Sequence, residues 1–318
     1  MRSRQLCATA LCAFSVPAIV LLPRVGWLWS GLTCFAVAAL VFLLRFLRSE
    51  ANPAESVAKT GGGRIALWAL WAWNLLLLGA GARLLCGIYP GGGALIGLLL
   101  LLLAAYAAGK GAAIVLRVSA VSFFFLTALF AVLYAFALPQ LRTDWLAPVT
   151  RADWTLLPWA LAPLTAVWLA QGRTKPLGWC VGGGSFAVLA ALITAGSLSP
   201  QLAGAIDFPF YDAAKSVSVL GAMERFEPLV SAALTAGGFS LLGLLCAVNR
   251  ELWRVLVPDE MRWSAPLNFV GGGSGLWLSA ALPAALTAIG STIFWAVLPI
   301  CLLWVENQKI LRKIEKKC

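Results

Sequence analysis

Prolines and a serine inside two strongly apolar segments are the residues best placed to bind a ligand. The segment LCATALCAFSVPAIVLLP carries Pro17 in its middle with Ser15 beside it, and WTLLPWALAPLTAVWLA carries Pro158 and Pro163. Proline removes a helical hydrogen bond, and a carbonyl freed at membrane depth is tolerated only against protein or a wet cavity. In transporters built from two inverted repeats, such broken helices form the substrate site. We therefore predict a substrate site at Ser15, Pro17, Pro158 and Ala162, with ordinary proline kinks as the alternative.

Other polar residues within apolar segments are few. Asn74 lies at the centre of one further segment, and Ser231, Thr235 and Ser240 lie on another. Side chains of these types in membrane helices more often hydrogen-bond a neighbouring helix than a ligand. We assign Asn74, Ser231 and Thr235 to the candidate substrate site and keep the contact between helices as the alternative.

Histidine is absent from the sequence, which narrows the chemistry available to the chain. Histidine is the commonest general base, proton shuttle and metal ligand. The eight cysteines form no Cys-x-x-Cys pair, and most lie in apolar runs, where cysteine usually packs as a small hydrophobic residue. No deep pair of carboxylates and no Ser/His/Asp set occurs. We predict that the protein is not an enzyme and has no metal or cofactor site.

Membrane-spanning helices are the elements that must position these residues. The chain of 318 residues is 61% hydrophobic and 12% charged, with a mean hydropathy of +0.88. Soluble domains are about 45–50% apolar and about 25% charged, and a membrane helix needs about 20 mainly apolar residues. The sequence predicts an all-α polytopic membrane protein with ten transmembrane helices in one domain. The predicted spans cover residues 5–22, 25–47, 65–88, 94–108, 113–138, 154–170, 177–198, 228–248, 264–282 and 284–305.

The distribution of charge predicts the orientation of these spans. Ten spans place both termini on one side, and most of the 24 lysines and arginines fall on that side, which the positive-inside rule assigns to the cytoplasm. The net charge of +11 is then mainly an orientation signal. We expect the basic tail at 306–318 to touch anionic lipid and not nucleic acid. We expect residues 199–227 to form an extracytoplasmic loop with a helix lying along the membrane surface.

Glycine triplets at 182–184 and 271–273 fall within two predicted spans. Glycine in a membrane helix lets a second helix approach closely. The triplets lack the spacing and the following Lys-Ser/Thr of a phosphate-binding loop. We therefore predict close helix packing at both triplets and no nucleotide site.

Two stretches carry a resemblance to a known family. Residues 98–117, LLLLLLAAYAAGKGAAIVLR, resemble the junction of the fourth and fifth helices in spore germination permeases, the B subunits of endospore germinant receptors. The family shows a run A-Y-x-x-x-K-G with an arginine about six residues further on. Here Tyr106, Lys110, Gly111 and Arg117 fill these positions.

The segment FPFYDAAKSVSVLGAMERFEPLVSAALTAGGF resembles the family's extracellular segment leading into the eighth helix. That segment has a proline, then an acid and a base at helical spacing, then Glu-Arg-hydrophobic-acid. The matching residues are Pro209, Asp212, Lys215, Glu224, Arg225 and Glu227. We interpret both sets as family-motif or gating residues, with helix capping as the alternative for Glu224 and Glu227.

The resemblance implies a fold of the amino acid–polyamine–organocation type, a LeuT-like transporter fold with 5+5 inverted repeats and both termini in the cytoplasm. It also implies a receptor complex in the inner membrane of the spore, with an A-type membrane subunit and a C-type lipoprotein. The sequence departs from the family in the first helix, where Val16 and Ala18 replace the expected glycines. We include both positions in the predicted substrate site, because the family's glycines approach the ligand there.

These features together predict a germinant-sensing, permease-like subunit that binds a small molecule, expected to be an amino acid, and triggers spore germination. Two alternatives stay open. One is an amino-acid or organic-cation transporter with no part in germination. The other is a membrane scaffold that has lost ligand binding, which the altered first helix would explain.

Overall fold

The computed structural model describes residues 2–20, 28, 31–32, 36, 53–60, 62–88, 93–146, 157–169, 176–206, 208–216, 227–302 and 304. These segments are almost entirely helical and contain no strand. Four helical stretches are long and apolar enough to cross a membrane, namely Gly63–Gly87, Ala112–Ala137, Pro228–Leu256 and Ala284–Leu302. The protein is therefore an all-α membrane protein.

The helices can be compared with the predicted spans one by one. The first, third, fourth and fifth predicted spans correspond in sequence to α1 (Arg2–Val20), α5 (Gly63–Ile88), α6 (Gly93–Lys110) and α7 (Ala112–Ala137). The sixth predicted span corresponds to α8 (Leu157–Leu161) together with the 3-10 helix η4 (Ala162–Leu169). The seventh, eighth and ninth correspond to α9 (Pro176–Leu198), α12 (Glu227–Leu256) and α13 (Ser264–Ala281). Over the tenth, α14 (Ala284–Ser291) continues into the π-helix η6 (Thr292–Val297). Most of the second span, 25–47, lies outside the described residues.

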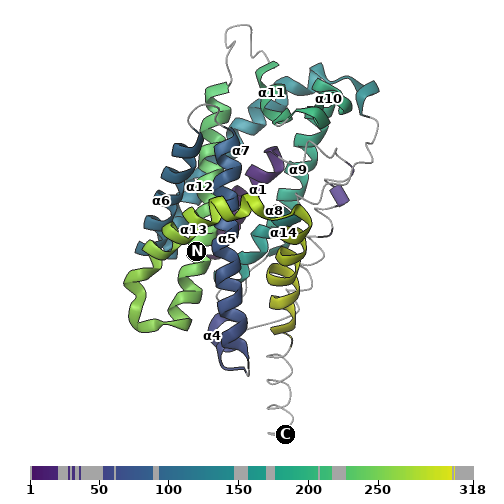
Figure 1. The fold of residues 1–318 in the computed structure, drawn as a ribbon. Coiled ribbons are helices and arrows are strands. Elements are labelled where there is room, and N and C mark those ends of the chain that lie inside the picture. The colour runs from purple at the N-terminus through teal and green to yellow at the C-terminus, as the bar shows by residue number, and fades with distance from the viewer. Residues whose placement is uncertain are drawn as a thin grey trace.

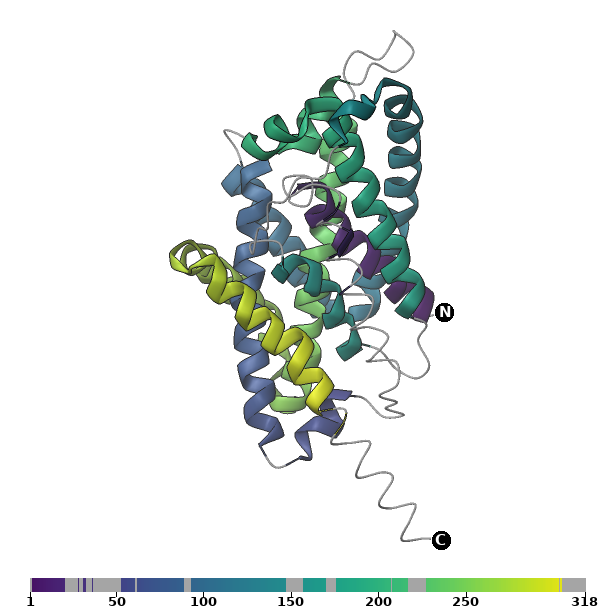
Figure 2. The same ribbon diagram turned by 90° about the vertical axis from the view of Figure 1, so that its right-hand side faces the viewer.

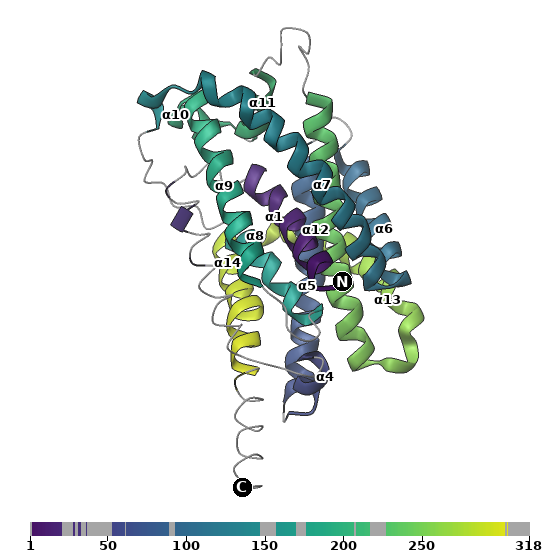
Figure 3. The same cartoon turned by 180° about the vertical axis from the view of Figure 1, so that it is seen from behind.

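The centre of the bundle is α12, which contacts α1, α5, α6 and α7. Its middle is fully buried at Leu241, Leu242, Leu244 and Leu245. The short helices α10 (Pro200–Ala205) and α11 (Pro209–Ser216) lie at one end of the bundle, and α4 (Pro53–Ala58) lies at the other (Figures 1 and 2). Seen from behind, α1 lies between α7 and α9, and it contacts both (Figure 3).

The crossing of α5 and α13 is built on glycine. A Cβ atom on Gly79 would overlap the backbone of Gly275 and Leu276, and one on Gly272 would lie 2.8 Å from Cδ2 of Leu78. The two helices can therefore meet only because side chains are missing there, which is how small residues bring membrane helices together. The predicted close packing is confirmed for the triplet 271–273. In the triplet 182–184, a Cβ on Gly182 would make only an ordinary contact of 3.6 Å with Leu11.

The predicted interruption of the first span at Pro17 is wrong, because α1 continues through this residue to Val20. The ring of proline fixes φ near −65°, a value that a helix accepts, although the ring removes the bond to the carbonyl of Ala13 and crowds that carbonyl. In the sixth span the helix does change character, from α to 3-10 at Ala162, directly before Pro163. Pro158 lies in the first turn of α8, where a backbone N–H would have no helical partner, so its absence costs no hydrogen bond.

A small apolar cavity as the candidate ligand site

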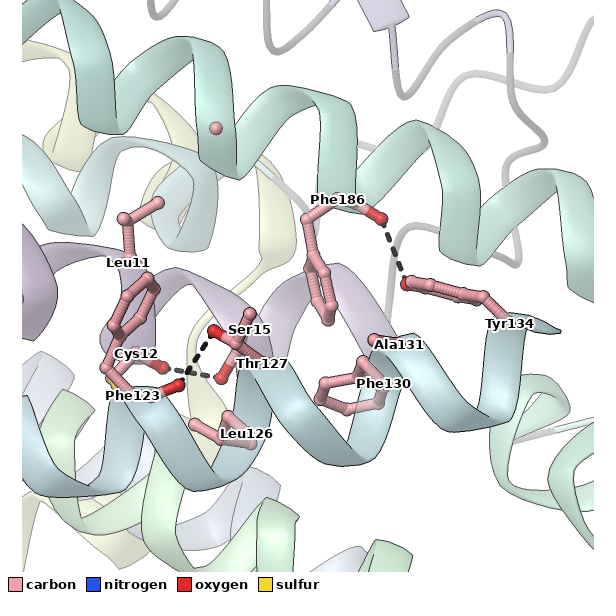
Figure 4. Close-up of a pocket in the computed structure, with 11 residues that line it drawn as sticks. Leu11, Cys12, Ser15, Phe123, Leu126, Thr127, Phe130, Ala131, Tyr134 and Phe186 are labelled. Carbon is pink, nitrogen blue, oxygen red and sulfur yellow. Dashed lines mark hydrogen bonds between the residues drawn. The ribbon is translucent and has the colours of Figure 1, made fainter.

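A cavity of about 280 Å³ lies between α1, α7 and α9 (Figure 4). Ligand sites in proteins typically measure about 300–1,000 Å³, so this cavity suits a small ligand. Its walls are formed by Leu11, Cys12 and Ser15 of α1, by Phe123, Leu126, Thr127, Phe130, Ala131 and Tyr134 of α7, and by Gly182 and Phe186 of α9. Among these described residues none is charged.

Three aromatic rings form one wall of the cavity. The ring centroids of Phe130 and Phe186 are 4.7 Å apart in an edge-to-face arrangement, and Tyr134 lies 6.1 Å from Phe130 and 6.0 Å from Phe186. Figure 4 shows Phe186 reaching from α9 toward Phe130 on α7. Such rings offer a large apolar surface, and their faces attract cations. The wall therefore favours an apolar group or an organic ammonium.

The polar groups at the cavity all donate to backbone carbonyls. Oγ of Ser15 donates to the carbonyl of Cys12 at 2.6 Å, and Oγ1 of Thr127 donates to that of Phe123 at 2.8 Å. The Tyr134 hydroxyl donates across to α9, to the carbonyl of Phe186 at 3.5 Å. A hydroxyl has one donor and two acceptor lone pairs, so each oxygen still has lone pairs to accept from a ligand. The site is thus apolar with a few weak acceptors.

The spacing of apolar and aromatic residues in the sequence places them on one face of α7. Phe123, Leu126, Phe130 and Tyr134 are three or four residues apart, and residues at this spacing share one side of a helix. Gly182 faces them from α9 without a side chain, which keeps space open. Sequence reasoning missed both α7 and α9 as parts of the site. The regular spacing of aromatic residues in FFFLTALFAVLY was the available signal.

A close contact with α12 fixes the position of Ser15. A Cβ on Gly237 would lie 2.7 Å from Oγ of Ser15 and 2.9 Å from Cγ2 of Val16, so only glycine fits at this crossing. Val16 is fully buried and packs on α12 instead of lining the cavity. On the other side, Sγ of Cys12 donates to the carbonyl of Ser119 at 3.3 Å, which joins α1 to α7. The cavity wall on α1 is therefore held from two directions.

Three other predicted substrate residues lie outside this cavity. Asn74 is fully buried on α5, and its Oδ1 accepts from Nε1 of Trp295 in the π-helix η6 at 2.7 Å. Ser231 on α12 lies 3.0 Å from the Tyr211 hydroxyl of α11, oxygen to oxygen. These two contacts match the alternative role that we kept for polar residues in membrane helices. Thr235 donates to the carbonyl of Ser231 at 2.9 Å, within α12 itself.

Two further predicted substrate residues are described, and neither lines the cavity. Pro158 and Ala162 are buried in α8 and η4, away from the cavity. Pro17 and Ala18 belong to α1, and their side chains lie outside the described part of the structure. Of the nine predicted positions, Ser15 is the one whose described side chain lines the cavity.

The first set of family-motif residues surrounds a tight connection. Nζ of Lys110, the last residue of α6, lies 5.4 Å from the ring centroid of Tyr106. Gly111 alone joins α6 to α7 and has a φ of 142°, which side chains rarely allow. Arg117 is exposed on α7. The backbone conformation of this connection therefore explains the glycine at position 111 without any role in ligand binding.

The described residues of the second set lie at the opposite end of the bundle. Pro209 is buried at the start of α11, and Asp212 lies in the first turn of that helix. The backbone of Lys215 belongs to α11, and that of Glu227 begins α12, but their side chains are outside the described residues. Glu224 and Arg225 lie in a segment that the structure does not describe.

The described helices form a bundle with a small cavity between α1, α7 and α9, which has no charged residue among its described lining and is partly open, since Thr127, Ala131 and Gly182 are exposed. In the described segments, no three His, Cys, Asp or Glu side chains come together as a metal site would require. No family model matches the sequence, and no curated protein matches it. The residues that line the cavity are therefore the basis for assigning a ligand class.

Proposed function

We propose that the protein is a germinant-sensing, permease-like subunit of a spore germination receptor, and that its ligand is an amino acid with an apolar side chain. The observation that carries the ligand class is the cavity between α1, α7 and α9, which is aromatic and has no charge among its lining residues. The motifs at 106–117 and 209–227 support the link to germination permeases. In this proposal the ten spans form a LeuT-like 5+5 arrangement with both termini in the cytoplasm.

The proposed binding mode follows from the chemistry of the walls. The apolar side chain of the ligand lies against Phe130 and Phe186, where burial of about 25 cal/mol per Å² drives binding. The amino group lies near the oxygens of Ser15 and Thr127, whose lone pairs can accept, and near the face of Tyr134. Because none of the described lining residues is basic, the ligand's carboxylate stays at the open side of the cavity and contributes little.

The proposed response is a shift between two conformations. A ligand moves such an equilibrium only by binding one state better than the other. The α1 segment is joined to α7 through Cys12 and packed on α12 at Gly237, while its contact with α9 at Gly182 is loose. Ligand binding would therefore alter the position of α9 relative to α1. In the receptor, the A-type subunit and the C-type lipoprotein would transmit this change in the inner membrane of the spore.

The proposal is tested by binding and by germination. Purified protein is heated with a panel of amino acids and with the amines that lack their carboxylates. We expect leucine-like or phenylalanine-like compounds to raise the melting temperature, and each amine to act within about threefold of its amino acid, since the proposed mode makes little use of the carboxylate. In a strain lacking the gene, germination with the active amino acid should fail. If no compound binds and germination is unchanged in that strain, the proposal is wrong.

The aromatic wall also favours a second function, transport of an organic cation. The faces of Phe130, Tyr134 and Phe186 would attract an ammonium group, an interaction worth about 0.5–2 kcal/mol. Uptake of a labelled amine into proteoliposomes, with and without a pH gradient, separates the two functions. Transport with normal germination in the deletion strain would favour this second function.

A further inference from the structure

A second cavity, of about 350 Å³, lies at the end of the bundle that carries α4. It is lined by Glu55, Ala58, Lys59, Arg64, Arg254 and Val255, which come from α4 and the turn after it, the start of α5 and the end of α12. Unlike the cavity between α1, α7 and α9, most of its lining side chains are charged. Its volume falls within the usual range for ligand sites of about 300–1,000 Å³.

The charges of this cavity are unevenly paired. Nη2 of Arg254 contacts Oε1 of Glu55 at 2.6 Å and Oε1 of Glu251 at 2.8 Å, so one cation takes up both carboxylates. Lys59 and Arg64 form no ion pair with any residue that the structure describes. The three basic side chains and the two carboxylates of Glu55 and Glu251 together carry one net positive charge. This charge lies on the side of Lys59 and Arg64.

The guanidinium of Arg64 is held in place by α12. Its Nη2 donates to the carbonyl of Leu256 at 3.1 Å, the last residue of that helix. This bond satisfies a carbonyl at a helix end, where cations are favoured. An arginine has five N–H donors in a rigid fork, so most of the donors of Arg64 remain for a ligand. The side chain is therefore oriented before any ligand arrives, which lowers the entropic cost of binding.

Tryptophans lie next to this cavity on the same two helices. The ring of Trp253 lies 5.8 Å from that of Trp68 and 5.3 Å from that of Trp71. Trp68 follows Arg64 by one turn of α5 and is 40% exposed, and Ile65 beside Arg64 is 76% exposed. Tryptophan concentrates at the boundary between lipid headgroups and acyl chains. The charged cavity therefore opens beside surface that suits lipid.

We propose that this cavity binds the phosphate headgroup of an anionic phospholipid. The single net positive charge balances the single negative charge of a phosphodiester. Arg64 supplies planar N–H donors that match phosphate oxygens, and Lys59 supplies a mobile point charge. The exposed side chains of Trp68 and Ile65 beside it receive the glycerol and the upper acyl chain, which a free phosphate ion lacks. Basic pockets between membrane helices are known to hold such headgroups. The inference does not depend on the proposed role in germination.

Lipid retention by the purified full-length protein tests this inference. Native mass spectrometry measures how much phosphatidylglycerol, relative to phosphatidylcholine, stays bound after detergent extraction. We expect a preference for phosphatidylglycerol that falls about fivefold in Lys59→Gln, the effect of one basic group near an anionic surface. Lys59 makes no side-chain hydrogen bond within the described residues, so this variant should fold. Arg64→Gln should show a loss at least as large.

Arg142→Gln is the matched control, since Arg142 stacks on Trp145 with its guanidinium carbon 4.7 Å from the ring centroid. Its backbone N–H donates to the carbonyl of Gly196, at the end of α9 that leads into α10, whereas α4 lies at the other end of the bundle (Figure 1). This variant should retain the full lipid preference. A third measurement adds millimolar inorganic phosphate, which should leave the lipid bound. Equal retention of both lipids, an equal loss in Arg142→Gln, or complete displacement by free phosphate would each overturn the assignment.

Discussion

Two helix crossings in this molecule follow opposite designs. Where α5 meets α13, Gly79, Gly272 and Gly275 have no side chains, and the backbones touch. Where α1, α7 and α9 meet, Phe130 and Phe186 hold the helices apart, and about 280 Å³ stays open. Because helices in a membrane gain stability from close packing, the first design makes a rigid joint. The second gives up packing and leaves room for a ligand.

The largest effect should come from adding one methyl group at the rigid joint. In Gly79→Ala the new Cβ would overlap the backbone of Gly275 and Leu276, which no side-chain rotation can relieve. We expect a loss of at least about 3 kcal/mol in the free energy of unfolding. Thermal unfolding in detergent measures this loss.

The control for this substitution lies on α13, next to the crossing but not in it. A Cβ on Gly273 would meet no atom within 4 Å, so Gly273→Ala should change stability by at most about 0.5 kcal/mol. Equal losses in the two variants would show that the α5–α13 joint does not depend on close backbone approach.

A smaller effect should follow from removing the polar bond that α5 makes with η6. In Asn74→Leu, Nε1 of Trp295 loses its acceptor while it remains fully buried. A buried unsatisfied donor costs about 1–3 kcal/mol, and adding Trp295→Phe should recover part of that loss by removing the donor. A double-mutant cycle of unfolding free energies tests this coupling, and strictly additive losses would refute it.

The smallest effect should come from Ser15→Ala at the cavity. The serine hydroxyl bonds within its own helix, so stability should change by about 0.5–1 kcal/mol. Ligand affinity should fall about three- to tenfold, because an acceptor at the cavity wall is lost. Calorimetric titration with the active amino acid measures this change. An unchanged affinity would place the amino group of the ligand away from Ser15.

The sequence predicted the helices better than the site. An apolar run of about 20 residues has few alternatives to a helix in lipid, and α5, α7 and α12 lie over predicted spans. The effect of Pro17 could not be predicted in the same way. It depends on the neighbouring helices that pack against α1, where Ala10, Ala13 and Val16 are fully buried.

The aromatic wall was missed because aromatic residues occupy both sides of α7. Phe130 is 2% exposed and faces α9, whereas Phe124 on the same helix is 73% exposed. Apolar side chains suit both lipid and a bundle interior, so hydrophobicity does not separate the two faces. Only the arrangement of neighbouring helices decides which face is enclosed. Ser15 was predicted because it lies beside Pro17, and its side chain lines the cavity although α1 is not interrupted at that proline.

The central claim is that the cavity between α1, α7 and α9 is the ligand site. It is tested most directly by ligand-induced stabilisation in Ala131→Phe, which adds a ring to the cavity wall, beside Val121→Phe, which is on the same helix but does not line the cavity. We predict that the active amino acid raises the melting temperature of the wild type and of Val121→Phe, and that its affinity falls at least about tenfold in Ala131→Phe. Equal affinity in all three proteins would contradict the claim.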